Sequence, residues 1–118
     1  MATAIRLVLQ CSVPAGKDGE VKELLRSLID TCKKNDPGLL SYEFFFNDTG
    51  SEMYAMEWYK DSAAVMTHMG IGGETLNQLL GTIQITRAEV FGNASDELIE
   101  AFEPFKAKFT KHWDGFTR

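Results

Sequence analysis

His68 is the residue of this chain best suited to acid–base chemistry. A neutral imidazole changes charge close to neutral pH, so it can take a proton from a bound molecule within hydrogen-bond reach. Glu57 lies near the end of a neighbouring predicted strand, where a buried carboxyl group must be paired or protonated. Pairing with Glu57 would orient the His68 ring and raise its basicity. In the alternative, structural role, His68 only hydrogen-bonds Glu57 or a backbone carbonyl and holds its helix on the sheet.

Aromatic side chains near these two residues are candidates for a pocket that binds an aromatic molecule. Tyr42, Tyr54 and Trp58 combine a flat ring with a polar tip, which suits a quinone-like ligand. The predicted pocket residues are Tyr42, Phe44, Tyr54, Trp58 and Tyr59. The alternative is an ordinary core, which is the more common use of such a stripe.

Other kinds of site find little support in the spacing of residues. His68 and His112 stand far apart, and no cysteine or carboxylate cluster has the spacing of metal ligands, so we predict no metal and no cofactor. Cys11 and Cys32 are predicted to be buried free thiols. The glycine-rich run at residues 70–73 follows a helix and lacks the lysine of a phosphate loop, so we expect a flexible rim at the pocket mouth.

The elements that must position these residues follow a β-α-β-β-α-β order. Between Val21 and Cys32 the apolar residues recur at helical spacing, so one face of that helix must lie on a sheet. This order predicts an α+β fold with a ferredoxin-like subunit and an antiparallel sheet. Strands are predicted at residues 5–13, 39–46, 52–59 and 82–91, with a second helix that starts at Asp61 or Ser62 and a short third helix at residues 74–80.

The sequence continues beyond this unit after Gly92. Ser95 can cap an extra helix, and Pro104 ends or kinks it. Phe109, Trp113 and Phe116 follow in the tail. We therefore expect a ferredoxin-like domain at residues 1–94, with the helix and tail of residues 95–118 packed on the sheet edge of the same domain or on a second subunit.

Both faces of the predicted sheet carry apolar residues. In the strands at residues 39–46 and 52–59, neither alternate set is reliably polar. Two such sheets packed face to face would bury both open faces, which predicts a homodimer. The alternative is a monomer with a few exposed aromatic residues.

The segment from Glu57 to Asp61, with His68 about two helical turns beyond it, resembles the antibiotic biosynthesis monooxygenase family. The segment at residues 37–43 resembles the same family's entry to the second strand, and the similarity covers residues 5–92. This resemblance implies a dimeric α/β barrel in which Glu57, Tyr59, Asp61 and His68 take the signature positions. The family more often has tryptophan where this chain has Tyr59. Trp58 lies one residue earlier and points to the other face of the strand, so it does not inherit that tryptophan's role.

The resemblance also implies an activity. Members that oxidise anthrones or quinols are similar in using O₂ without flavin, haem or metal, so we expect a cofactor-independent monooxygenase for a phenolic, quinol or anthrone-like aromatic, with His68 as the base. Haem degradation by a branch of the family is the nearest rival, but residues 75–78 offer no histidine for iron. A non-enzymatic homodimer that binds a small hydrophobic molecule is the remaining alternative.

Composition limits the possible partners. The 118 residues suit one domain, and the formal charge of -5 offers no positive field for nucleic acid. No run of eighteen apolar residues suggests a membrane span, and the first residues lack a signal-peptide pattern. We therefore expect a cytoplasmic protein whose partners are a small aromatic molecule, O₂ and a second copy of the chain.

Overall fold

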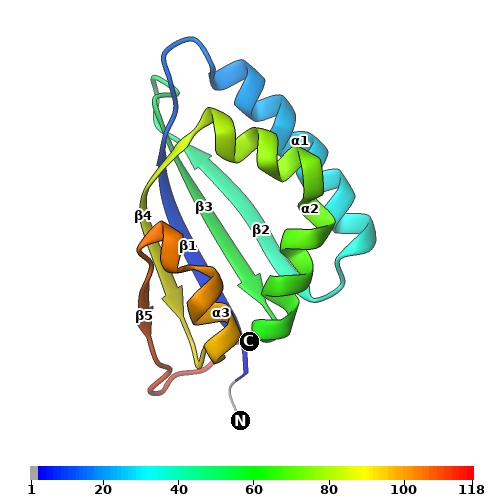
Figure 1. Cartoon of the computed structure of the whole chain (residues 1–118), viewed down its shortest axis with the longest axis vertical. Helices are drawn as coiled ribbons and strands as arrows, with labels where there is room; N and C mark the ends of the chain where they lie inside the picture. The colour runs from blue at the N-terminus through cyan, green and yellow to red at the C-terminus, as the bar shows by residue number, and fades with distance from the viewer. Residues whose placement is uncertain (1–2) are drawn as a thin grey trace.

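The computed structural model describes residues 3–118 as one sheet with two long helices on the same face (Figure 1). The predicted β-α-β-β-α-β order is confirmed, and a 3-10 turn and a short strand follow the extra helix. The elements are β1 (Ile5–Ser12), α1 (Asp18–Asn35), β2 (Leu39–Phe46), β3 (Glu52–Tyr59), α2 (Ser62–Thr82), β4 (Gln84–Phe91), α3 (Asp96–Ala101), the 3-10 turn Glu103–Phe105 and β5 (Lys108–Thr110).

The sheet has the strand order β2-β3-β1-β4-β5. Its first four strands pair antiparallel, as predicted. β5 was not predicted, and it pairs parallel to β4, which makes the sheet mixed. A strand of only three residues at an edge has too short an alternation to be recognised in the sequence.

Alternate residues of β3 separate the two faces of the sheet. Met53, Ala55, Glu57 and Tyr59 are buried beneath the helices, whereas Met56 is exposed on the opposite face. The register places Glu57 opposite Leu7 of β1 and Tyr42 of β2. Because directly paired residues share a face, the covered face continues across the neighbouring strands.

α2 extends to Thr82 and consists of two helical parts joined by a kink, in agreement with the predicted second helix and short third helix. The two parts meet at Gly73, whose φ of 48° and ψ of -131° interrupt the helix. Only glycine adopts this conformation without strain, so the glycine at this position allows the change of direction. The run at residues 70–73 is therefore part of a kinked helix and not a rim loop. Among the described residues, no helix combines the length and apolarity needed to cross a membrane.

The segment after β4 divides into a packed part and an exposed part. Ser95 caps α3 as predicted, because its Oγ accepts the N–H of Leu98 at 3.2 Å. Leu98 and Phe102 are buried in the core beside residues of β1 and α2. In contrast, Trp113 and Phe116 are 93% and 81% exposed, so two of the three tail aromatics do not pack on this subunit.

Candidate functional site

The start of α2 determines where His68 points. The Asp61 carboxylate accepts a hydrogen bond from the N–H of Ala64 at 2.8 Å. Of the two predicted helix starts, Asp61 and Ser62, Asp61 is therefore the N-cap. Fixing the first residue of the helix also fixes the direction of each later side chain. His68 consequently lies on the inner side of α2 and is buried, with 5% of its surface exposed.

A second element brings Asp36 to His68. Asp36 ends α1, where its N–H donates to the carbonyl of Cys32 at 2.9 Å, and the turn that follows packs against α2. At Gly38 in this turn a Cβ atom would lie 2.7 Å from Cβ of Ala64, so a larger residue would push the turn away from α2. Close packing of turn and helix therefore places Asp36 beside the His68 ring.

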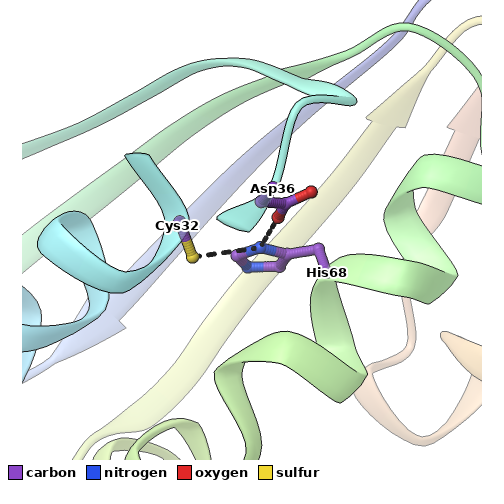
Figure 2. A group of neighbouring side chains, drawn as sticks. All are labelled: Cys32, Asp36 and His68. Carbon is purple, nitrogen blue, oxygen red and sulfur yellow. Dashed lines mark hydrogen bonds and ion pairs between the residues drawn. The ribbon is translucent and has the colours of Figure 1, made fainter. Parts of the chain in front are cut away.

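Asp36 and Cys32 both approach the same ring nitrogen of His68 (Figure 2). Oδ2 of Asp36 lies 2.9 Å from Nδ1 of His68, and Sγ of Cys32 lies 3.6 Å from it. An ionised carboxylate can only accept, so the proton of a neutral ring belongs on Nδ1 and Nε2 is left as an acceptor. Burial, with the nearby Asp36 and Glu57, raises the pKa of Cys32 to about 11, which keeps its thiol protonated at neutral pH.

Glu57 lies on the other side of the ring. Its Oε1 is 4.0 Å from Nε2 of His68 and accepts a hydrogen bond from the Tyr59 hydroxyl at 2.5 Å. Burial raises the pKa of Glu57 above its ordinary value, and Asp36 adds to the rise, while His68 and Tyr59 oppose it. The carboxyl group that hydrogen-bonds the imidazole is therefore Asp36, where the sequence suggested Glu57, and Glu57 pairs with Tyr59.

His68, Glu57 and Tyr59 border a cavity between the sheet and the helices. Its empty space is about 660 Å³, including the part that is open to solvent. Tyr42, Phe44, Glu57, Tyr59 and His68 line it as predicted, and apolar residues such as Leu7, Leu76, Leu79, Ile83 and Phe102 supply most of the remaining wall. A few polar groups in an apolar cavity are typical of a site for a small organic molecule.

Two predicted pocket residues do not reach this cavity. Tyr54 and Trp58 alternate with Glu57 and Tyr59 along β3, so they lie on the other face of the sheet. Trp58 instead packs under the guanidinium group of Arg6, 4.3 Å from the ring centroid. Neither residue is placed to contact a molecule beside His68.

Sequence reasoning missed Asp36 and Cys32 as members of the site. The sequence predicts only a buried free thiol at Cys32, and it indicates no role in the site for Asp36. Their four-residue spacing places both on one side of the last turn of α1, a signal visible in the sequence. Their meeting with His68 depends on the packing of α1 against α2, which no local pattern reveals.

One protein-family model matches the part of the chain that contains most of this site. The model of the antibiotic biosynthesis monooxygenase family matches residues 4–71, a range that includes Asp36, Glu57, Tyr59 and His68. The chain belongs to this family. No curated protein matches the sequence at a significant level.

Solved structures share the fold of this monooxygenase-family chain. MupZ from Pseudomonas fluorescens is similar with a TM-score of 0.86 and 24% identity, over 98% of this chain and 95% of MupZ. SnoaB, a cofactor-independent oxygenase from Streptomyces nogalater, has a TM-score of 0.65 and 13% identity over 80% of this chain and 96% of SnoaB. Rv0793 from Mycobacterium tuberculosis has a TM-score of 0.63 and 18% identity over 80% and 98% of the two chains. The match to MupZ is long enough to include the segment after β4.

Proposed function

We propose that this protein is a cofactor-independent monooxygenase that oxidises a phenolic, quinol or anthrone-like aromatic with O₂, using His68 as its general base. The supporting observation is the fixed orientation of the imidazole. Asp36 holds Nδ1 of His68 at 2.9 Å, while Nε2 lies on the Glu57 side of the ring. His68 and Glu57 both border an apolar cavity. A base oriented in this way beside an apolar pocket is suited to deprotonating a bound phenol.

The proposed reaction begins when Nε2 of His68 takes the acidic proton of the substrate. The resulting anion passes one electron to O₂, and the substrate radical and superoxide combine to form a C–O bond. Loss of water from the resulting peroxide breaks the O–O bond and leaves a carbonyl group. For an anthrone-like CH₂ group, one O₂ is consumed, one oxygen atom enters the product and the other leaves as water.

Glu57 is suited to donating a proton in the later steps of the proposed reaction. Its raised pKa favours the protonated carboxyl, and it lies on the Nε2 side of His68. A protonated Glu57 could therefore supply a proton to the peroxide oxygen that leaves, while Asp36 stabilises the imidazolium formed in the first step. Two acidic groups in different environments thus take different roles, as is common in acid–base catalysis.

A homodimer is part of the proposal. The face of the sheet opposite the helices exposes apolar side chains, including Phe45, Met56 and Phe91. Packing this face on that of a second copy would remove these side chains from water, which is the driving force for association.

The test is O₂ consumption by metal-free protein with a panel of quinols and anthrone-like phenols. We expect uptake above background that is lost in His68→Ala and retained in His112→Ala, which removes an exposed tail histidine. Binding of quinol and quinone alike, without O₂ uptake from any panel member, would instead support the non-enzymatic ligand-binding alternative.

A further inference from the structure

Three atoms of kinds that bind metal ions meet at His68, and two of their residues, Cys32 and Asp36, do not line the cavity. Sγ of Cys32, a carboxylate oxygen of Asp36 and Nδ1 of His68 all lie within 4.8 Å of one another, and all three residues are buried (Figure 2). Cys32 and Asp36 come from the last turn of α1 and its cap, and His68 comes from α2. Two packed helices therefore hold the group together.

Hydrogen bonding does not satisfy all of these atoms at once. The Nδ1 atom of a neutral ring either carries one proton or accepts one, so it can serve Asp36 or the Cys32 thiol but not both. Oδ1 of Asp36 is also buried and has no hydrogen-bond partner among the described residues. Buried polar atoms are rarely left unpaired, so Oδ1 of Asp36 has room for a further partner such as a water or an ion.

We propose that Cys32, Asp36 and His68 form a binding site for a divalent transition-metal ion of the zinc class. Thiolate, imidazole and carboxylate are the ligands that Zn²⁺ uses in proteins. Ordinary zinc bond lengths at a tetrahedral angle separate sulfur and nitrogen ligands by roughly 3.6 Å. The Sγ to Nδ1 distance is already 3.6 Å, and the Asp36 to His68 distance of 2.9 Å needs to open by only a few tenths of an ångström.

The site has a route from the surface. Cys32 lines a hollow between the end of α1 and the start of β2, together with Ile29, Lys33, Leu40, Ser41 and Tyr42. Its empty space is about 470 Å³, including the part that is open to solvent. An ion can thus approach the thiol from this hollow, which shares Tyr42 with the cavity but not Cys32. Lys33 opposes a cation there, whereas the carboxylate of Asp36 favours it.

Occupancy of this site has a consequence that rests on the proposed function. A metal bound at Nδ1 leaves the ring proton on Nε2, so the imidazole can no longer accept a proton from a molecule in the cavity. The ion would therefore inhibit the monooxygenase. The existence of the site does not depend on that activity, because metal binding is measured without any substrate.

The experiment is metal loading of the full chain with Zn²⁺ and with Co²⁺ after removal of bound metals. We expect one ion per chain by elemental analysis and, with Co²⁺, the near-ultraviolet absorption of a cobalt–thiolate bond. Cys32→Ala should lose this absorption and bind at least about tenfold more weakly, because loss of a direct ligand should exceed the effect of losing an outer partner. Cys11→Ala is the matched control, since Cys11 is the other buried free thiol and lies in β1.

Two results would overturn the site. One is the absence of stoichiometric binding to the wild-type chain, and the other is an unchanged cobalt–thiolate absorption in Cys32→Ala. Circular dichroism shows whether each variant is folded. If Cys32→Ala does not fold, Cys32→Ser keeps the size of the side chain and must likewise lose the thiolate absorption.

Discussion

The two faces of the sheet use the same strands but present different chemistry. On the covered face, Glu57 and Tyr59 are hydrogen-bonded to each other beside His68. On the open face, Met56 and Trp58 alternate with them and carry no acid–base group. A shift of one residue along β3 thus moves a side chain from the candidate site to the surface proposed for dimer contact.

The largest expected difference between the two faces is the effect of a substitution on kcat. His68→Ala should lower kcat by about 10²- to 10⁴-fold, the usual contribution of a general base. Trp58→Phe changes the open face and should leave kcat in the dimer nearly unchanged. Steady-state O₂ uptake measures both. A large loss of kcat in a folded, dimeric Trp58→Phe variant would show that the open face takes part in the reaction.

Asp36→Asn is expected to have the next largest effect. The amide keeps the size of the side chain but no longer stabilises an imidazolium ion, so kcat should fall by about tenfold or more, within the range of acid–base contributions. KM should change little, because Asp36 does not line the cavity. The pH dependence of kcat should also shift, whereas a purely structural Asp36 would leave that profile in place.

A charge introduced on the open face should weaken the proposed dimer. Met56 is 44% exposed, and Met56→Glu would place a carboxylate in the proposed dimer contact. We expect a shift from dimer to monomer in sedimentation, with little change in the unfolding of the subunit. Ser27→Glu adds the same charge at an exposed position of α1, away from this face, and is a control that should remain dimeric. A wild-type chain that is monomeric at all concentrations would contradict the contact.

Glu57 should make stability depend on pH in a defined direction. Its pKa is raised in the folded protein, so the unfolded chain loses this proton first as pH increases. The free energy of unfolding should therefore fall above the ordinary pKa of 4.5 and level off above the folded pKa. Glu57→Gln should remove this part of the fall, as measured by urea unfolding across the pH range. Equal pH slopes in both proteins would contradict the raised pKa.

Much of the fold was readable from local patterns. The apolar stripe between Val21 and Cys32, the cap at Ser95 and the β-α-β-β-α-β order are confirmed. The three-residue strand β5 was missed because a single short edge strand leaves no clear alternation. The glycine-rich run at residues 70–73 predicted a flexible rim between two helices, because glycines in a sequence are compatible with either a loop or a kink. The structure has a kink at Gly73, whose φ is 48°.

The candidate site was predictable only in part. The family resemblance and the chemistry of histidine led to Glu57 and His68, which the structure places on one side of the cavity. Strand alternation alone would have separated Trp58 from Glu57, although the pocket prediction grouped them. Asp36 could not be assigned to the site because its contact with His68 spans 32 residues and depends on how two helices pack.

The central claim is that Asp36 holds His68 with Nε2 free to accept a proton. A long-range ¹H–¹⁵N spectrum of metal-free protein with labelled histidine rings tests it without a substrate, with the spectrum of His112→Ala assigning the two rings. At about pH 8, where an ordinary imidazole is neutral, the account predicts a proton on Nδ1 of His68 and none on Nε2. A neutral His68 ring that carries its proton on Nε2 would contradict it.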